Sequence, residues 1–340
     1  MGMFDKLYAN LRQSKKTIVF TEGMDPRILE ASSRLLKEDL MNVILCGNKE
    51  EVSNKANELG FDISKAEIVD PKDYSDHEAM VNLMFELRKG KMTLEECEAN
   101  CLKSNYFGTM LVKMGKADAL LGGATYSTAD TVRPALQIIK TRKGANLVSS
   151  CFILYRVKDG VEETICMGDC AINLSYEDTL DKVTGEVVFS GAQKLAEVAI
   201  ESAKTASFFG IDPKVAILSF STYGSGKGGT VELSHNAVIE AKKKDPSLVV
   251  DGEFQFDAAV SEEVAKTKCP NSKVAGHANT FIFPLIEAGN IGYKIAQRLG
   301  GYEAYGPILQ GLNAPINDLS RGCNADEVYK MAVITAGMAE

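Results

Sequence analysis

Short apolar segments alternate with longer amphipathic segments over most of this chain. In the first third, candidate strands lie at Thr17–Phe20, Val43–Cys46, Glu67–Val69 and Ala119–Gly122, and charged segments of helical length such as Arg27–Glu38 separate them. Parallel strands require a crossover connection, which a helix usually supplies. The alternation therefore predicts an α/β protein with a parallel sheet that is covered by helices on both faces.

The pattern changes near residue 145. Two long β-branched segments, Leu147–Val157 and Glu163–Asn173, flank Lys158-Asp159-Gly160, and Asp-Gly between two strands is a strong hairpin signal. Alternation then resumes, with predicted helices near 191–209, 230–244, 258–266 and 292–299, strands near 215–220, 248–250 and 273–283, and a closing helix within 306–340. A length of 340 residues suggests about two domains. Because no long linker is present, we expect these domains to be closely joined.

The charge balance limits the classes of partner. The chain has 38 Lys and Arg against 46 Asp and Glu, a net charge of −8, which argues against general binding to nucleic acid or to an anionic membrane. No apolar run approaches a membrane-spanning length and the first residues do not resemble a signal peptide, so we expect a cytoplasmic protein. Eight scattered cysteines without a CxxC pair predict reduced thiols and no metal site.

A glycine-rich loop follows the predicted strand at 215–220. It is not a Walker A loop, because Ser221 and Gly228 occupy positions where that motif needs Gly and Ser or Thr. Gly224, Gly226 and Gly229 do match the dinucleotide pattern GxGxxG, and Asp251 follows at a suitable distance. Three interpretations stay open: a dinucleotide loop, a helix start that binds another phosphate group, and a structural turn. The candidate binding residues are Ser221, Thr222, Gly224, Ser225 and Lys227.

Hydroxyl groups and an arginine gather between Ser127 and Pro134, after the strand that ends at Gly122. Ser127, Thr128 and Thr131 are candidates for substrate binding, although they could also simply cap a helix. Arg133 is harder to explain in that way, because a guanidinium in the first turns of a helix opposes the helix dipole. Such an arginine has either an acidic partner or a bound anion, and both interpretations stay open.

A second polar turn, at 317–323, leads into a carboxylate-rich helix start. Asn324 could cap this helix, with Asp326 and Glu327 in its first turn. In a functional interpretation, Ser320 donates a hydrogen bond, Arg321 binds an anion and a nearby carboxylate acts as a base. The acidic segment from Asp251 to Asp257 could hold a metal ion but is better explained as a polar loop.

Five stretches of this chain, in this order, are similar to the phosphate acetyltransferase (phosphotransacetylase) family. The similarity runs nearly from end to end, and its last two stretches are long and specific. The stretches are Thr128–Ile139, Leu218–Ser225, Asp251–Ala259, Gly289–Gly300 and Gly306–Cys323.

The resemblance implies two three-layer αβα domains with a cleft between them, as in isocitrate and isopropylmalate dehydrogenases. One domain would combine residues 1–145 with 305–340, and the other would span 146–304. The active site would lie in the cleft, and the protein would be a homodimer. The implied reaction is reversible acetyl transfer between acetyl phosphate and coenzyme A, with phosphate as the other product. Coenzyme A is then a substrate, and no prosthetic group, metal or nicotinamide is implied.

The resemblance also assigns roles to individual residues. Ser320 and Arg321 match the family's active-site Ser-Arg pair, and Arg133 and Arg88 match two further active-site arginines. The family's base is an Asp seven residues after the Ser; Glu327 stands there, with Asp326 before it, so the identity of the base stays open. Cys170 lies near the implied site and is interpreted as packing.

These roles give a mechanism by direct attack in a ternary complex. Glu327 or Asp326 would take the proton of the coenzyme A thiol, and Ser320 would hydrogen-bond the sulfur. The thiolate would attack the carbonyl carbon of acetyl phosphate while Arg321, Arg133 and Arg88 stabilise the departing phosphate. The alternatives are a phosphate butyryltransferase or related acyltransferase, a nicotinamide-dependent dehydrogenase on the same fold, and a non-catalytic phosphate- or coenzyme-binding regulator.

Overall fold

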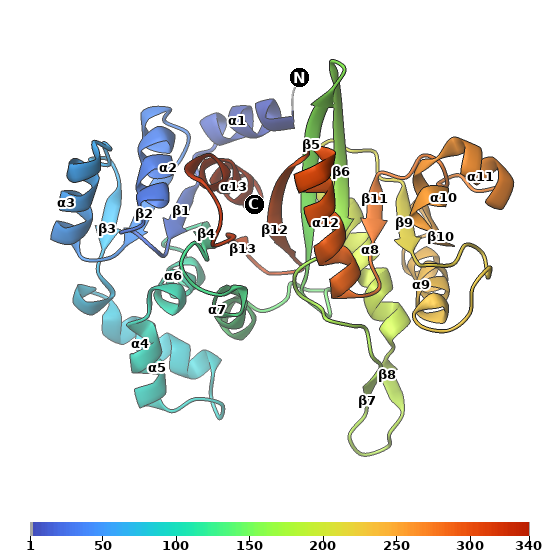
Figure 1. The fold of residues 1–340 in the computed structure, drawn as a ribbon. Helices are drawn as coiled ribbons and strands as arrows, with labels where there is room; N and C mark the ends of the chain where they lie inside the picture. The colour runs from blue at the N-terminus through green and yellow to red at the C-terminus, as the bar shows by residue number, and fades with distance from the viewer. Residues whose placement is uncertain (1–2, 340) are drawn as a thin grey trace. The chain divides into compact units, whose positions relative to one another are not determined.

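The computed structural model describes residues 3–339, which form two compact units (Figure 1). Unit 1 contains the residues up to Lys143 together with those from Leu312 onward, and unit 2 spans Gly144–Gly311. The first unit therefore takes its sequence from both ends of the chain. Unit 2 ends at Gly311, later than the predicted boundary at 305, because residues 305–310 belong to a strand of its sheet.

Unit 1 is built on a parallel sheet with the strand order β13-β4-β1-β2-β3. The strands are β1 (Thr17–Phe20), β2 (Asn42–Cys46), β3 (Glu67–Val69), β4 (Ala119–Gly122) and β13 (Ile316–Asp318). Its helical elements are α1 (Met3–Gln13), α2 (Pro26–Lys37), α3 (Lys49–Leu59), η1 (Pro71–Asp73), α4 (His77–Leu87), α5 (Leu94–Cys101), α6 (Ser104–Lys113), α7 (Thr128–Pro134), the π-helical η2 (Ala135–Ile139) and α13 (Ala325–Gly337). The four strands predicted for the first third of the chain are confirmed.

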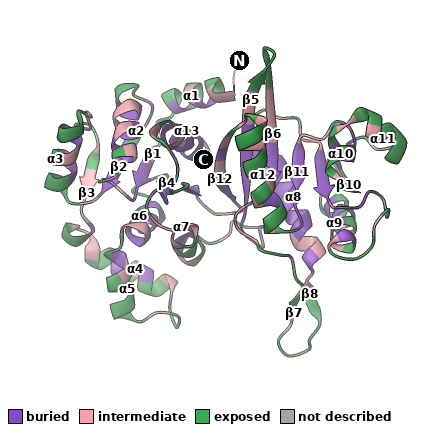
Figure 2. Cartoon of the chain, viewed as in Figure 1, coloured by how far each residue is buried: buried purple, intermediate pink, exposed green. Residues whose placement is uncertain are grey.

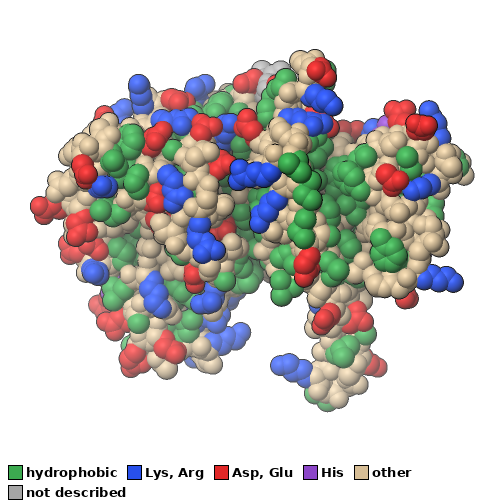
Figure 3. Space-filling view, in the orientation of Figure 1, with side chains coloured by type: hydrophobic (Ala, Val, Ile, Leu, Met, Phe, Trp, Pro, Cys, Tyr) green, Lys and Arg blue, Asp and Glu red, His purple; other side chains and the backbone are tan. Residues whose placement is uncertain are grey.

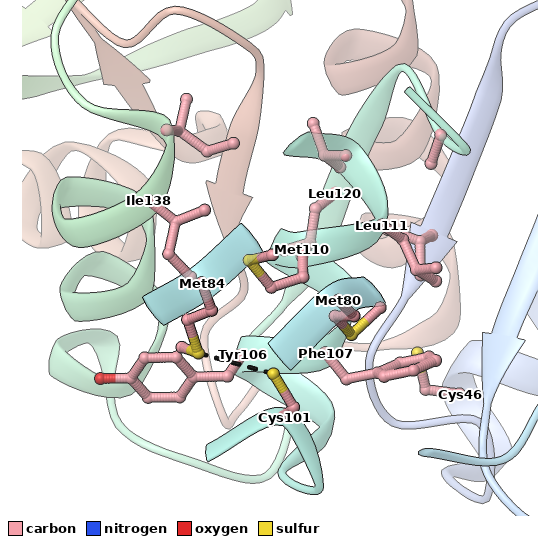
Figure 4. Packing of buried hydrophobic residues seen from close by; sticks show 14 of the residues in the cluster. Cys46, Met80, Met84, Cys101, Tyr106, Phe107, Met110, Leu111, Leu120 and Ile138 are labelled. Carbon is pink, nitrogen blue, oxygen red and sulfur yellow. Dashed lines mark hydrogen bonds between the residues drawn. The ribbon is translucent and has the colours of Figure 1, made fainter. Parts of the chain in front are cut away.

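A sulfur-rich core lies between one face of this sheet and helices α4 to α6 (Figure 4). Met80, Met84 and Met110 pack with Cys101 and Phe107, and the Cys101 thiol lies 3.5 Å from the Met84 sulfur. Flexible, polarisable methionine side chains fill irregular gaps between helices that cross at different angles. This core fixes the end of α4, where Arg88 is found.

Unit 2 contains a mixed six-stranded sheet with the order β10-β9-β11-β6-β5-β12. The strands are β5 (Ser149–Lys158), β6 (Val161–Gly168), β9 (Val215–Leu218), β10 (Val250–Phe254), β11 (Thr280–Ile282) and β12 (Glu303–Gln310), and the helices are α8 (Gly191–Phe208), α9 (Val231–Lys244), α10 (Phe256–Val260), α11 (Glu262–Lys268) and α12 (Ile286–Gly300). β5 and β6 form the predicted hairpin, with Asp159 and Gly160 both at positive φ. Figure 2 shows that the strands of both sheets are largely buried and that the outer helix faces are exposed.

Several elements of unit 2 differ from the prediction. The second hairpin strand ends at Gly168, because the side chain of Asp169 accepts hydrogen bonds from three following backbone N–H groups and turns the chain. The helix predicted at 258–266 is divided at Ser261, which caps α11. The strand predicted at 273–283 shortens to β11, because Ser272 holds a turn. The strand predicted at 248–250 runs instead from Val250 to Phe254.

The segment between Leu174 and Gly191 forms a projecting two-stranded hairpin, β7 (Thr179–Leu180) and β8 (Val187–Phe189). The carboxylate of Asp181 accepts hydrogen bonds from the N–H groups of Val183 and Thr184 and so closes the turn. The hairpin is mostly exposed (Figure 2), and Val183 at its tip is 94% exposed.

The charges, the cysteines and the helices of the structure can be compared with what the composition predicts. Lys, Arg, Asp and Glu side chains are interspersed over the face of the described residues seen in Figure 3. All eight cysteines are free and buried. Within residues 3–339, no group of three His, Cys, Asp or Glu side chains is arranged to hold a metal ion, and none of the described helices is long and apolar enough to cross a membrane.

Candidate active site

Most of the predicted catalytic residues lie at one edge of the unit 1 sheet. β4 pairs with both β1 and β13, all three strands are parallel, and their carboxyl ends therefore meet. In an open α/β sheet this edge is the usual place for a ligand. The loop after β4 leads to Ser127 and α7, and the loop after β13 carries Ser320 and Arg321.

The start of α7 is held by its own side chains. Ser127 is the N-cap residue, but its hydroxyl donates to the carboxylate of Asp130 at 2.6 Å rather than accepting from the backbone. That hydrogen bond is the main reason why the pKa of Asp130 is lowered. Arg133 is exposed, and its Nη1 lies 4.0 Å from Asp130 Oδ1. A pair this long and this exposed contributes little energy, so the guanidinium stays available to an anion.

A buried carboxylate, Asp318 at the end of β13, ties α7 to the neighbouring loop. It accepts hydrogen bonds from the hydroxyl of Thr128 at 2.7 Å and from that of Thr131 at 2.5 Å. Burial raises its pKa to about 6, although the two threonine donors oppose this shift. The hydroxyl hydrogens of both threonines, which are predicted substrate-binding residues, are thus used inside the protein.

A second, half-buried carboxylate lies at the end of β1. Glu22 accepts hydrogen bonds from the N–H groups of Gly123 (3.2 Å) and Thr125 (2.9 Å) and from the hydroxyls of Thr125 and Thr21. Burial raises the pKa of Glu22, and these donors oppose the shift. No role was predicted for Glu22 or for Asp318, although Asp318 lies in the polar turn singled out at 317–323. The available signal was an acidic residue within two positions of the end of the short strands β1 and β13.

The turn that carries Ser320 and Arg321 is fixed through its backbone. The Arg27 side chain donates from Nη1 to the carbonyl oxygens of Arg321 (2.9 Å) and Cys323 (3.1 Å), and from Nη2 to that of Ala124 (2.8 Å). Arg27 is itself held by Asp25 through paired hydrogen bonds. Arg321 is exposed, so the backbone is anchored while the guanidinium extends outward. Arg27 was not among the predicted site residues.

The two candidate bases have different environments. Glu327 and Asn324 form a capping box, in which the Asn324 N–H donates to Glu327 Oε2 at 3.0 Å and the Glu327 N–H donates to Asn324 Oδ1 at 2.9 Å. Asp326 forms ion pairs with Arg34 (2.9 Å) and Lys330 (3.2 Å). Burial acts to raise the pKa of Asp326, but these hydrogen bonds outweigh it and the pKa is lowered. Asp326 is therefore the poorer base of the two.

Arg88 lies at the C-cap of α4, in the predicted break between two helices. Its Nε is buried and has no hydrogen-bond partner among the described residues. Arg88 and Arg133 both lie near Tyr106: burial raises the pKa of this phenol, and the two positive charges oppose the shift. The structure thus brings two of the predicted active-site arginines into the same region of unit 1.

The glycine-rich loop of unit 2 is organised around Glu253. This carboxylate accepts from the Gly224 N–H (2.6 Å) and the Ser221 hydroxyl (2.9 Å), and it lies 3.3 Å from His235 Nδ1. Burial acts to raise the pKa of Glu253, but hydrogen bonds, first of all the one from Gly224, outweigh it and the pKa is lowered. The Gly226 N–H donates to the Ser221 hydroxyl. Two N–H groups that a dinucleotide phosphate would need are thus used internally.

Of the other predicted residues of this loop, two stabilise the turn and one is exposed. The hydroxyl of Thr222 accepts from the Gln255 N–H, and that of Ser225 accepts from the Thr222 N–H, so both stabilise the turn. Lys227 is exposed and lines a hollow of about 610 Å³ within unit 2, together with Tyr223 and His235. Lys227 is therefore the member of the set most available to a ligand.

The remaining candidates have structural partners. Asp251 accepts from the hydroxyls of Tyr223 (2.7 Å) and Ser272 (2.6 Å), and Asp257 pairs with Lys268 at 3.0 Å. The thiol of Cys170 is buried, and burial raises its pKa well above the ordinary value. A thiol in that state is a poor nucleophile and packs as a small apolar group.

Comparison with known proteins relates these features to a family. Residues 3–336 match the family model described as phosphate acetyl/butaryl transferase. A phosphate acetyltransferase from Bacillus subtilis (strain 168) is 53% identical over 322 residues, which is 95% of this chain and 94% of that protein. A phosphotransacetylase structure from Streptococcus pyogenes has a TM-score of 0.88 at 48% identity and covers 98% of both chains.

A more distant solved structure shares the fold. A branched-chain phosphotransacylase from Enterococcus faecalis V583 has a TM-score of 0.66 at 19% identity, over 96% of this chain and 100% of that one. The predicted α/β class is confirmed by these structures, in which both units have counterparts. With a family match that spans nearly its whole length, the chain belongs to the phosphate acetyl/butaryl transferase family.

Proposed function

We propose that this enzyme is a phosphate acetyltransferase, which interconverts acetyl-CoA plus phosphate with coenzyme A plus acetyl phosphate. The observation that carries the proposal is the pair of exposed arginines on segments that follow directly paired strands: Arg133 on α7, beyond β4, and Arg321 on the turn beyond β13. Two guanidinium groups at the carboxyl edge of one sheet suit a phosphoryl group, which arginine binds in bidentate fashion. Relatives about 50% identical carry the same activity in their names.

The first chemical requirement is a thiolate, because the free thiol of coenzyme A has an ordinary pKa near 8.5. Glu327 is the better candidate for the base, since Asp326 is held by two ion pairs and has a lowered pKa. For Glu327 to act as the base, either its Oε1 accepts the thiol proton, or the Asn324 N–H first releases its hydrogen bond to Oε2. Ser320, exposed on the adjacent turn, donates a hydrogen bond to the sulfur.

The second requirement is stabilisation of the leaving phosphate. The thiolate attacks the carbonyl carbon of acetyl phosphate, the C–S bond forms, and the C–O bond to phosphate breaks with its electron pair on phosphate. Arg321 and Arg133 hold the phosphoryl oxygens as this charge develops, and Arg88 adds a third cation. The buried Nε of Arg88, without a partner among the described residues, is a donor that a substrate oxygen could satisfy.

Coenzyme A enters as a substrate, and Lys227 in unit 2 is a candidate for one phosphate group of a substrate. No prosthetic group or metal takes part in the proposed reaction. Its substrates and the eight free cysteines fit a cytoplasmic protein.

The proposed assembly is a homodimer. On α12, Ile291, Ile295 and Leu299 follow one another at four-residue intervals and are each more than half exposed, with Leu299 at 85%. Hydrophobic side chains are visible along this helix in Figure 3. A second copy of the chain would remove this stripe from water, at a gain of roughly 1.5–3 kcal/mol for each side chain that becomes fully buried.

The deciding experiment measures acetyl-CoA formation from acetyl phosphate and coenzyme A by the absorbance of the thioester, with NAD omitted. Arg321→Ala is expected to lower kcat at least 100-fold, because its contact strengthens as phosphate leaves. Arg12→Ala, which removes an exposed arginine on α1, serves as the matched control. An unchanged kcat in Arg321→Ala with only a raised KM would contradict the assigned role.

Butyryl phosphate is the competing substrate, because the family model covers both acyl groups. A higher kcat/KM for butyryl than for acetyl phosphate would replace the proposed activity with that of a butyryltransferase.

A further inference from the structure

The first turn of α13 holds one oxygen of the Glu327 carboxylate in place. Asn324 is the N-cap residue, and its backbone N–H donates to Glu327 Oε2 at 3.0 Å, while its side-chain Oδ1 accepts from the Glu327 N–H at 2.9 Å. Glu327 Oε1 has no hydrogen-bond or ion-pair partner among residues 3–339. The capping box therefore occupies one carboxylate oxygen and leaves the other available to accept a proton.

The hydroxyl of Ser320 is oriented in a similar way by the turn before α13. Its oxygen accepts a hydrogen bond from the Gly322 N–H at 3.3 Å, and the Ser320 carbonyl oxygen accepts from the Cys323 N–H at 2.9 Å. The hydroxyl hydrogen has no acceptor in the described part of the chain, so it can be donated to a sulfur atom. Asn324 thus joins the turn that carries this donor to the helix that carries the base.

A second capping box in the chain shows that the cap itself needs no charge. At the start of α8 the Ser190 N–H donates to Gln193 Oε1 at 2.9 Å, and the Gln193 N–H donates to Ser190 Oγ at 3.1 Å. A neutral glutamine closes that box in the same way as Glu327 closes the box of α13. The carboxylate at position 327 is therefore more than helix capping requires.

We propose that Asn324 is a positioning residue for the base: its capping box fixes Glu327 Oε2, so that Oε1 accepts the thiol proton while Ser320 donates to the sulfur. The S–H electron pair stays on the sulfur, and Glu327 then releases the proton to water or to the departing phosphate. The box also accommodates the glutamate that stands where the family's base is an Asp, because the longer side chain reaches back to the N-cap N–H. The inference rests on the proposed acetyltransferase function.

The test separates positioning of the base from stability of the helix. Asn324→Ala removes the Oδ1 acceptor and is expected to lower kcat for acetyl-CoA formation at least fivefold, with both KM values within twofold. Asn324→Ser keeps a side-chain acceptor at the N-cap and should restore kcat to within twofold of the unchanged enzyme. In Glu327→Gln the box can still form, as at α8, but the base is absent, so adding Asn324→Ala should change the residual kcat less than twofold.

Ser190→Ala is the matched control, because it removes the same kind of cap from α8 and is expected to leave kcat unchanged. An equal loss from Asn324→Ala with and without Glu327→Gln, or a kcat within twofold of the unchanged enzyme in Asn324→Ala, would overturn the positioning role. If Asn324→Ala does not fold, Asn324→Gly decides the question, since glycine is tolerated at an N-cap but lacks the acceptor.

The same assay distinguishes failure of the inference from failure of the proposed function. An unchanged enzyme that makes no acyl-CoA from acetyl or butyryl phosphate would overturn both. An active enzyme whose variants depart from the expected pattern would overturn the inference alone.

Discussion

The cost of burying Asp318 can be measured through the pH dependence of folding. Its folded-state pKa is about 6 against an ordinary value of 3.8, a difference of about 2.2 units. One pKa unit corresponds to about 1.4 kcal/mol, so the ionised carboxylate lowers the free energy of unfolding by about 3 kcal/mol at pH 7.5. The side chain is almost fully buried, so solvent screens little of this cost.

The sign follows from proton binding. Between pH 4 and 6 the folded protein holds the proton of Asp318 more tightly than the unfolded chain does, so stability falls as pH rises through this window. Asp318→Asn lacks this titration. Removing the charge gains about 3 kcal/mol at pH 7.5, and replacing the two hydrogen bonds to a carboxylate by weaker ones to a neutral amide costs roughly 1–3 kcal/mol, so the free energy of unfolding of the variant is expected to be equal to or slightly above that of the unchanged protein.

The informative quantity is the difference in unfolding free energy between variant and unchanged protein at two pH values. From pH 7.5 to pH 5 the unchanged protein regains about 1.4 kcal/mol through Asp318, and the variant regains nothing by this route. The difference should therefore shift by about 1.4 kcal/mol toward the unchanged protein, measured by urea denaturation followed by circular dichroism. Other charged or titratable groups facing Asp318 are Glu22, Tyr126 and Arg321, and they are present in both proteins. A difference that is the same at both pH values would refute the reasoning.

Three further substitutions probe other parts of the site. Glu327→Gln should slow acetyl-CoA formation at least tenfold by removing the base, whereas Asp326→Asn should change it less than threefold; comparable kcat values for both would remove Glu327 from the mechanism. Arg27→Ala frees the carbonyl groups of the Arg321 turn, so kcat should fall at least tenfold and the free energy of unfolding by about 1–3 kcal/mol, and full activity would show that the turn needs no such anchor. Cys170→Ala should retain kcat because the buried thiol is not a nucleophile, and a loss above 100-fold with an unchanged urea midpoint would point to an acyl-cysteine step.

The elements of unit 1 could be predicted because their signal is local. Strands β1, β2, β3 and β4 are short apolar runs between amphipathic helices, and each was located within a residue of its bounds. The elements of unit 2 were harder, because side chains rather than hydrophobicity end them. Asp169 and Ser272 each turn the chain by accepting backbone hydrogen bonds, which the apolar pattern of the neighbouring residues does not reveal.

The site residues also differ in how far the local sequence reveals them. Arg133 stands out in the sequence because a guanidinium in the first turns of a helix opposes the helix dipole, and Arg321 because it lies in a polar, glycine-containing turn. The family resemblance adds a role for each. The sequence of the turn at 317–323 does not reveal the role of Asp318, because its partners, Thr128 and Thr131, lie nearly 190 residues away and become neighbours only when β13 adds to β4. Arg27 was missed for the same reason, since its acceptors follow β13 while it lies at the start of α2.

The net charge of −8 is a poor guide to a ligand at this edge, and the hydrogen bonds explain why. Two acidic groups at this edge, Glu22 and Asp318, accept hydrogen bonds from backbone N–H groups and hydroxyls rather than from guanidinium groups. Asp130 approaches Arg133 no closer than 4.0 Å and instead accepts from Ser127. The carboxylates thus stabilise the loops without neutralising the arginines by direct contact. Arg133 and Arg321 are therefore exposed to an approaching anion, whereas Asp318 is buried inside the protein.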